Sequence, residues 1–271
     1  MSNTVRILAT SLALGGLVLA ATPAFGQEAR TVSAVETVAE TPERHAAWTA
    51  ILSTYVQPGE DGLNRFDYGA LKANEADRAA LTAYLASFET LDFDSLTRDD
   101  AFAAWANLYN ALTIDHMIGR YPVKSIRSGY IIGPWKRVKT VADGREVSLD
   151  EIEHDILRVE WNDPRVHYAV NCASIGCPNL QTKAWEAATL DEDLDRAARE
   201  FINTERGVTV RERGGLQVST IYKWFEDDFG GSEAGVIEHL LQYADDDLAA
   251  QIRANADIKR HKYDWDLNDV Q

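Results

Sequence analysis

Residues 105–110 read Trp105-Ala106-Asn107-Leu108-Tyr109-Asn110, in the middle of the longest helical pattern of the chain, which we expect to cover residues 96–119. Apolar side chains fall on both faces of this segment, and a helix that is apolar all round is buried in a protein core. Asn107 and Asn110 lie among those side chains, so both amides need hydrogen-bond partners inside the protein. Either they tie neighbouring loops to the helix, or one of them orients a catalytic imidazole or lines an oxyanion site.

The patterns on either side of this helix predict an α+β protein. Further helices are expected at residues 43–56, 75–88, 148–159, 190–203, 220–229, 233–244 and 246–255. Hairpins are expected around Asp143-Gly144 and Gly214-Gly215, with strands also at residues 166–171 and 258–267. Because helices outnumber strands and do not alternate with them regularly, we predict one mainly helical domain around a small antiparallel sheet, over residues 43–271.

Ser148-Leu149-Asp150-Glu151 is a capping box, in which the serine hydroxyl and the glutamate satisfy each other's backbone donors at the start of a helix. Glu153 falls in the apolar stripe of that helix, where a carboxylate must be paired, protonated or functional. Arg158 and Arg165 are the candidate partners for an ion pair. His154 lies about a quarter-turn from Glu153 on the same helix.

Both cysteines lie in one short segment, residues 167–178, which reads His-Tyr-Ala-Val-Asn-Cys-Ala-Ser-Ile-Gly-Cys-Pro. If residues 166–171 form a strand, His167 and Cys172 point to opposite faces, and a bend must bring them together. Three interpretations stay open. Cys172 and Cys177 form a disulfide in an oxidising compartment, Cys172 is a thiolate nucleophile served by His167 or His154, or the cysteines bind a metal with further ligands. A redox role for the pair is weaker, because the spacing differs from Cys-x-x-Cys.

The start of the chain predicts where the protein acts. Residues 1–26 resemble a secretory signal peptide, in which Arg6 precedes an apolar run and Ala24-Phe25-Gly26 offers the small residues of a cleavage site. The apolar run is shorter than a membrane-spanning helix. Residues 27–42 lack periodicity and are expected to be a flexible leader. We therefore expect a periplasmic protein with no membrane span after cleavage of the signal peptide.

The amino-acid composition limits the classes of molecule that the protein can bind. With 27 basic and 43 acidic residues, the net charge is −16, which excludes binding of nucleic acid or anionic lipid through overall electrostatics, although local exceptions remain open. Lys136, Arg137 and Lys139 form a small basic patch, for which a solvated loop is the simplest explanation. The chain has no phosphate-binding loop, Gly-x-Ser-x-Gly or His-Glu-x-x-His motif. We predict no cofactor and no metal, and expect a small-molecule or peptide ligand.

Several different motifs follow one another across residues 45–268. They are Trp105-x-Asn107-Leu108-Tyr109-Asn110-Ala111-Leu112-Thr113, Tyr121-Pro122-Val123 with Ser125-Ile126, Ile152-Glu153-His154 with Leu157-Arg158, Asp163-Pro164-Arg165-x-His167, Asn171-Cys172-Ala173-Ser174-x-Gly176-Cys177-Pro178, Trp224-Phe225 with Asp228-Phe229, and Tyr263-Asp264-Trp265-x-Leu267-Asn268. With these motifs the chain resembles the bacterial and plant family known as domain of unknown function 547. Ala104 and Ala106 depart from the Phe and Ile usual in that family, but the polar positions are kept.

The resemblance implies a remote relationship to papain- and transglutaminase-like proteins. In that comparison the helix with Asn107 and Asn110 takes the place of the helix that bears the nucleophilic cysteine, and the His167 strand takes the place of the histidine strand. That helix carries no thiol here. Either the site is inactive, or Cys172 supplies the sulfur from the strand, as in permuted members of that superfamily.

Two functions therefore compete. The first is a thiol-dependent amide or ester hydrolase or acyl transferase acting on an envelope peptide or a small amide, with a thiol that attacks, an imidazole that takes the proton and an amide that orients it. Its candidate residues are Cys172, His167, His154, Asn107, Asn110 and Glu153. The second is a non-catalytic periplasmic binding module in which a Cys172–Cys177 disulfide pins the loop.

Overall fold

The computed structural model of the protein describes residues 44–270. The expected signal peptide (residues 1–26) and flexible leader (residues 27–42) lie outside the described residues. Within residues 44–270, no helix combines the length and the apolar character needed to cross a membrane.

The central element is the long helix α5 (Arg98–Arg120), which confirms the helix expected at residues 96–119. It begins at Thr97, whose side chain accepts a hydrogen bond from the backbone N–H of Asp100, so one of the free donors at the helix start is satisfied. Every side chain from position 102 to position 114 is buried, including Asn107 and Asn110. The two-faced apolar pattern therefore identified an interior helix correctly.

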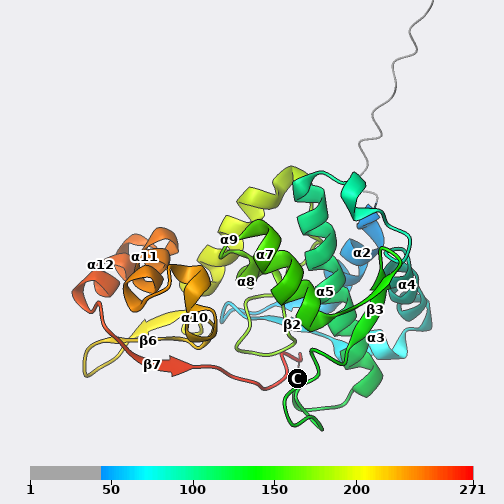
Figure 1. The fold of residues 1–271 in the computed structure, drawn as a ribbon. Helices are drawn as coiled ribbons and strands as arrows, with labels where there is room; N and C mark the ends of the chain where they lie inside the picture. Colours follow the sequence, from blue (N-terminus) through cyan, green and yellow to red (C-terminus); the bar gives the residue numbers. More distant parts are fainter. Residues whose placement is uncertain (1–43, 271) are drawn as a thin grey trace, which may run out of the picture. The chain divides into compact units, whose positions relative to one another are not determined.

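The other helices surround α5 or follow it along the chain (Figure 1). The α-helices are α2 (Ala46–Tyr55), α3 (Tyr68–Ala73), α4 (Glu75–Ala86), α6 (Leu149–Glu151), α7 (Arg158–Trp161), α8 (Val166–Ala169), α9 (Leu190–Ile202), α10 (Ile221–Trp224), α11 (Glu233–Tyr243) and α12 (Asp246–Ala254). Short 3₁₀ turns are η1 (Phe93–Ser95), η3 (Ala187–Thr189) and η4 (Glu226–Phe229), and η2 (Ile152–Leu157) is a π-helix. The capping box at Ser148 starts the run α6–η2–α7 as expected.

The strands are short and form three small sheets instead of the single antiparallel sheet that we expected. Antiparallel pairs are β1 (Val56–Pro58) with β2 (Asn64–Phe66), and β3 (Lys139–Ala142) with β4 (Arg145–Ser148). The third sheet joins β5 (Val208–Val210), β6 (Leu216–Ser219) and β7 (Ile258–Lys262). In it β6 and β7 are parallel, because the chain between them crosses over through α10, α11 and α12. The mainly helical α+β class is confirmed.

The predicted strand at residues 166–171 is wrong, since residues Val166–Ala169 form the short helix α8. The backbone N–H groups of Val166 and His167 donate to the carbonyls of Asp163 and Pro164, at 3.1 and 3.3 Å. Pro164 has a fixed φ near about −65°, which suits a helical turn. The side chain of His167 therefore projects from a helical turn. The alternation of side chains along a strand does not predict which residues lie on the same face as His167.

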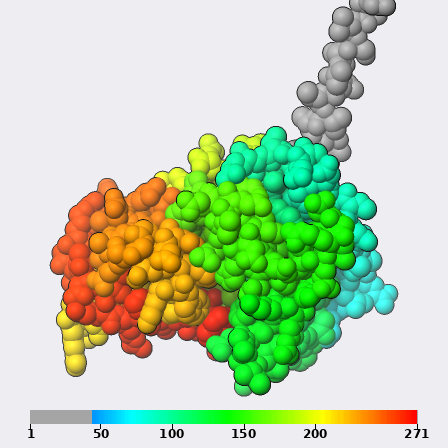
Figure 2. All heavy atoms as spheres, in the orientation of Figure 1, coloured from blue at the N-terminus to red at the C-terminus, as the bar shows by residue number. Residues whose placement is uncertain are grey.

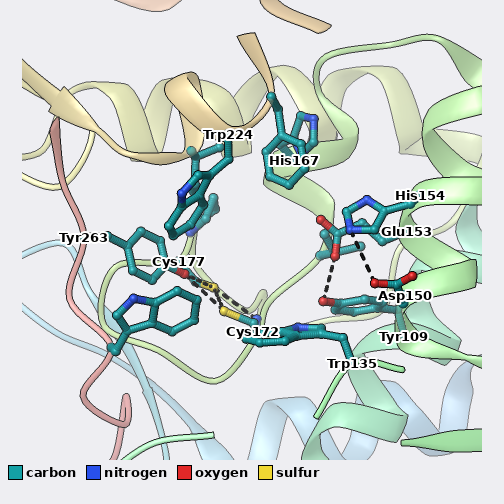
Figure 3. A pocket seen from close by; sticks show the side chains of 15 residues that line it. Tyr109, Trp135, Asp150, Glu153, His154, His167, Cys172, Cys177, Trp224 and Tyr263 are labelled. Carbon is teal, nitrogen blue, oxygen red and sulfur yellow. Dashed lines mark hydrogen bonds and ion pairs between the residues drawn. The ribbon is translucent and has the colours of Figure 1, made fainter. Parts of the chain in front are cut away.

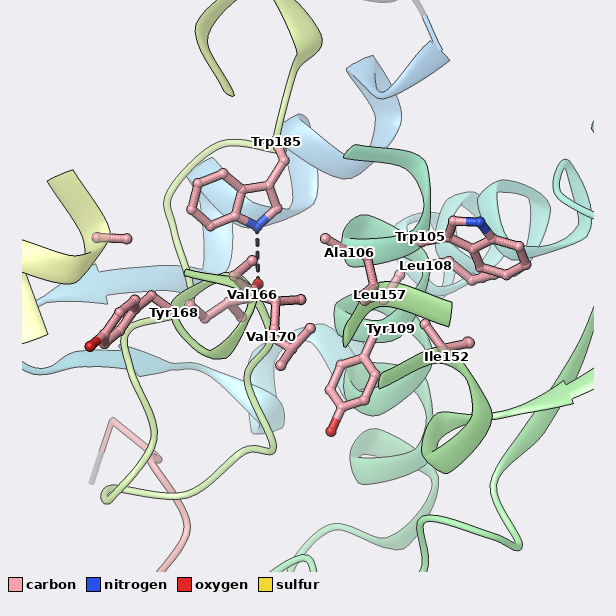
Figure 4. Close-up of a cluster of buried hydrophobic side chains, with 14 of the residues drawn as sticks. Trp105, Ala106, Leu108, Tyr109, Ile152, Leu157, Val166, Tyr168, Val170 and Trp185 are labelled. Carbon is pink, nitrogen blue, oxygen red and sulfur yellow. Dashed lines mark hydrogen bonds between the residues drawn. The ribbon is translucent and has the colours of Figure 1, made fainter. Parts of the chain in front are cut away.

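One hydrophobic core runs through the described residues. Figure 4 shows the part beside the candidate site, where side chains of α5, η2 and α8 interdigitate. The indole N–H of Trp185 donates to the carbonyl of Ala169 across this cluster, at 3.0 Å. Burial of these apolar surfaces, each large side chain worth about 1.5–3 kcal/mol, fixes the positions from which the polar side chains of the site project.

Candidate functional site

A pocket opens beside the exposed end of this core and encloses about 650 Å³, counting its open mouth. Its lining residues are Tyr109, Trp135, Asp150, Glu153, His154, His167, Val170, Cys172, Cys177, Pro178, Ile221, Trp224, Phe225, Tyr263 and Trp265. On the face shown in Figure 2, the green segment around residue 150 and the orange and red segments after residue 220 lie side by side. The pocket takes side chains from both. The cavity itself holds about 160 Å³, less than the roughly 300–1,000 Å³ of sites for drug-sized ligands, so it suits a small ligand.

Four of the six predicted site residues, Glu153, His154, His167 and Cys172, line this pocket, together with Cys177 (Figure 3). Asn107 and Asn110 are not among the lining residues, and their assignment to the site needs correction.

The two asparagines hold backbone segments in place. Asn107 donates to the carbonyl of Trp185 at 2.9 Å and accepts from its N–H at 3.0 Å. Asn110 donates to the carbonyl of Ala169 at 2.8 Å and accepts from the N–H of Asn171 at 2.8 Å. Neither amide faces an imidazole, because both of its ends are used by backbone groups. Asn110 does serve the site indirectly, since the chain that it holds leads into Cys172.

The sulfur atoms of Cys172 and Cys177 lie 2.6 Å apart, and both cysteines are free. The Tyr263 hydroxyl bridges them at 3.1 and 3.0 Å. The backbone N–H of Cys172 donates to the sulfur of Cys177 at 3.1 Å, and the hydroxyl of Ser174 lies 3.4 Å from the sulfur of Cys172. Within residues 44–270, no imidazole lies within hydrogen-bond distance of either sulfur.

The two thiols differ in acidity. The pKa of the Cys172 thiol is raised by the hydrogen bond between Cys172 and Cys177 and by burial. Burial would also raise the pKa of Cys177, but hydrogen bonds from Cys172, from Tyr263 and from backbone N–H groups outweigh it and lower that pKa. The more exposed sulfur therefore keeps its proton. A nucleophilic Cys172 would require the opposite order, because the thiolate is the reactive form.

His167 belongs to a charged cluster on the opposite side of the pocket from the sulfurs (Figure 3). Its Nε2 lies 2.6 Å from Asp228, and Arg158 holds the same carboxylate with two bonds of 2.6 and 2.9 Å. Burial lowers the pKa of His167 despite the neighbouring carboxylate. Burial alone would raise the pKa of Asp228, but the bonds from His167 and Arg158 hold it well below its usual range. The imidazole is therefore neutral and donates to an ionised Asp228.

Glu153 is the buried carboxylate of the pocket, with 8% of its surface exposed. The hydroxyl of Tyr109 donates to it at 2.9 Å, and burial raises the pKa of Tyr109 well above its usual value, so this phenol stays protonated. The expected ion pair is absent from residues 44–270. Arg158 binds Asp228, and Arg165 binds three other aspartates. Glu153 thus faces the pocket without a basic partner.

His154 and Asp150 form the rim next to Glu153. The Nε2 of His154 lies 3.9 Å from Asp150, and its Nδ1 lies 3.3 Å from Arg158. Asp150 also pairs with Lys136 at 3.5 Å. His154 is partly exposed.

Aromatic rings form the wall that the sequence did not predict. Trp224, Tyr263 and Trp265 pack against one another with ring centroids 4.5–5.5 Å apart, and Trp135 meets Trp265 edge-on at 5.7 Å. Two of these rings come from the last residues of the described chain, and Figure 3 shows Trp224 and Tyr263 beside the sulfurs. The only signal for them was their place in the family motifs.

The lining combines two carboxylates with six aromatic rings and contains no lysine or arginine. Within residues 44–270, no group of three or more histidine, cysteine or acidic side chains is placed to hold a metal ion.

Residues 93–202 match the family model described as "Protein of unknown function, DUF547". No curated protein and no solved structure matches the chain, so the relationship to papain-like proteins stays a prediction. The matched segment contains α5, both cysteines, Glu153 and His167, whereas the aromatic wall after residue 220 lies beyond it. The match over these residues supports an assignment to the DUF547 family.

Proposed function

We propose that this chain is an exported, periplasmic binding module whose pocket takes a small organic cation, with an amine or ammonium group held between Glu153 and the aromatic wall. The observation that carries the proposal is the position of Glu153, a buried carboxylate that opens to an aromatic pocket and forms no ion pair within residues 44–270. Arg158 acts on it electrostatically, but the guanidinium is bound to Asp228. Export rests on the signal-peptide pattern of residues 1–26.

The electrostatics favour a cation over an anion or a neutral ligand. A buried carboxylate is costly unless a positive charge or several donors compensate it, and Glu153 receives one hydrogen bond, from Tyr109. A ligand ammonium would supply the missing charge. The faces of tryptophan and tyrosine rings attract cations by about 0.5–2 kcal/mol, so Trp224 and Tyr263 add to the same preference. Trp265 already has the guanidinium of Arg127 over its ring, at 4.9 Å.

The lining also favours an organic cation over a metal ion. A hard metal ion needs about six oxygen ligands, but among residues 44–270 only Glu153 and Asp150 bring carboxylates to the pocket. An alkylammonium group needs less, because its methyl or methylene groups pack on rings while its charge faces one carboxylate.

Isothermal titration with a matched pair of probes tests the proposal. Choline carries a positive charge, and 3,3-dimethyl-1-butanol has the same shape without the charge. We expect choline to bind at least tenfold more tightly than the neutral alcohol, and Glu153→Gln to remove most of that difference. Glu238→Gln, which makes the same change on the exposed face of α11, should bind choline like the unmodified protein. Equal binding of the two probes, or unchanged binding by Glu153→Gln, would overturn the proposal.

A second function, the thiol-dependent hydrolase or acyl transferase, is favoured by one observation. Cys172, His154 and His167 line the same pocket. Cys172 would pass its proton to an imidazole and bond to the acyl carbon of an amide or ester. The amine or alcohol would leave with that proton, and water would release the acid and restore the thiol. This requires Cys172 to leave its contact with Cys177.

The state of the cysteines separates the two functions. With the binding module we propose a Cys172–Cys177 disulfide in the periplasm, formed when the two thiols pass two electrons and two protons to a disulfide donor. Alkylation with iodoacetamide, with and without prior reduction, followed by mass spectrometry, distinguishes the states. Rapid alkylation of Cys172 alone, without reduction, supports the thiol enzyme. Alkylation of both cysteines only after reduction supports the disulfide.

A further inference from the structure

The loop between α5 and β3 exposes its most apolar residues to solvent. Ile131 is 97% exposed and Ile132 is 89% exposed, the highest values among the large hydrophobic side chains of residues 44–270. Exposed hydrophobic clusters on soluble proteins mark interaction surfaces. In Figure 1 this loop is the green segment at the lower edge of the fold, after α5.

The loop is built as a fixed projection. Arg120 donates to the carbonyl of Ser128 and lies over the ring of Tyr130 at 4.6 Å, so the base of the loop is tied to the end of α5. Gly133 has φ +99°, and a Cβ at that position would lie 1.9 Å from the ring of Trp135. A close approach that only glycine permits therefore seats the loop on Trp135.

Positive charge surrounds these two isoleucines. Residues 116–142 contain six lysines and arginines and no acidic residue, in a chain with 43 acidic and 27 basic residues. The exposed basic side chains of the segment are Lys124, Arg127, Lys136, Arg137 and Lys139. Lys136 and Lys139 pair with Asp150 and Glu146, so Lys124, Arg127 and Arg137 carry the positive charge of the loop. Tyr130 and Trp135 flank the isoleucines, and such aromatic side chains are typical of the boundary between lipid and water.

We propose that this loop docks the protein on an anionic membrane surface, with Ile131 and Ile132 inserted between the lipids and the basic side chains against the headgroups. Two exposed side chains on a projecting loop fit a fluid bilayer, because lipid chains can pack around both of them. The strongly acidic remainder of the molecule is repelled by such a surface, so the local basic segment sets the orientation. This surface adjoins the cation pocket, because Trp135 and Asp150 line both, but Ile131 and Ile132 do not line that pocket.

Co-sedimentation of the purified protein with vesicles tests the docking. One set of vesicles contains about one-third phosphatidylglycerol in phosphatidylcholine, and the other contains phosphatidylcholine alone. We expect binding to the anionic vesicles that weakens as salt is raised. Ile131→Ser/Ile132→Ser should lower the partition coefficient at least tenfold. Lys124→Gln/Arg137→Gln should lower it by about fivefold for each charge.

Matched variants control for general effects. Val159→Ser removes another exposed apolar side chain, and Arg213→Gln/Arg260→Gln removes two exposed charges far along the chain from this loop. Both should bind like the unmodified protein, and all variants should keep the same circular dichroism spectrum. The proposal is overturned if the unmodified protein does not bind the anionic vesicles, if it binds both vesicle types equally, or if the loop variants bind as well as their controls. Excess free choline in every tube keeps the cation pocket from binding the phosphatidylcholine headgroup, so none of these outcomes bears on choline binding in the pocket.

Discussion

His239 makes the folded protein sensitive to mild acid. Its imidazole is 7% exposed, its Nε2 lies 2.7 Å from the hydroxyl of Tyr168, and its ring meets Phe229 edge-on at 4.7 Å. Burial lowers its pKa from 6.5 to about 4, and the net effect of the neighbouring charges does not reverse this. The folded protein thus holds a neutral imidazole where the unfolded chain would be protonated.

The sign and size of the effect follow from the two pKa values. At pH values well above 6.5 neither state binds a proton at His239, and its contribution to stability is complete. Between pH 6.5 and about 4 the unfolded state binds the proton first, so stability falls with pH, and below that range the loss is complete. At pH 5.5 the loss is about 1.4 kcal/mol. His239→Gln keeps an acceptor for Tyr168 but does not titrate.

Urea unfolding followed by circular dichroism, at pH 8.0 and pH 5.5, measures the difference. At pH 8.0 we expect His239→Gln to be less stable by about 1–2 kcal/mol, because aromatic packing is lost. At pH 5.5 that gap should shrink by about 1.4 kcal/mol, since only the unmodified protein loses stability by keeping a neutral imidazole. A gap that is the same at both pH values would refute the assignment of acid sensitivity to His239.

Three further changes test the supports of the site. Asn110→Ala leaves the buried N–H of Asn171 without a partner, whereas the carbonyl of Ala169 keeps its bond from Trp185. It should lower the free energy of unfolding by about 1–3 kcal/mol in urea titrations; a loss below about 0.5 kcal/mol would mean that water replaces the amide. Asp228→Asn weakens the charged bonds to Arg158 and should cost about 2 kcal/mol at pH 7. Because the pKa of Asp228 is lowered by folding, that cost should shrink as the pH falls below about 4, and a cost independent of pH would contradict the ion pair. Gly133→Ala forces Trp135 to move and should change the tryptophan fluorescence spectrum of the folded protein; an unchanged spectrum would argue against the close contact.

Local sequence patterns predicted those helix starts and turns that depend on interactions between neighbouring residues. The capping box at Ser148 forms as predicted, and both residues of the Asp143-Gly144 turn adopt the positive φ that a tight hairpin requires. The segment after Asp163 shows the limit of such signals. A few alternating residues do not distinguish a strand from one turn of helix. Here the backbone N–H groups of residues 166 and 167 donate to the carbonyls of Asp163 and Pro164, and the segment is helical.

The candidate site was only partly accessible from the sequence. Glu153 stood out because a carboxylate in an apolar stripe needs an explanation, and its position in the pocket supports that reasoning. Its partner was not predictable, since Arg158 turns to Asp228, 70 residues away. Tyr263 reaches Cys172 across 91 residues. Such contacts depend on how the whole core packs, which no local pattern records.

The most direct test of the central claim is a crystal structure of the protein soaked with arsenocholine, a choline analogue whose arsenic atom scatters anomalously. We predict an anomalous peak inside the pocket, between the carboxylate of Glu153 and the rings of Trp224 and Tyr263, and no such peak in Glu153→Gln crystals soaked at the same concentration. Peaks confined to the outer surface, or a pocket peak of equal height in both crystals, would contradict a cation site organised by Glu153.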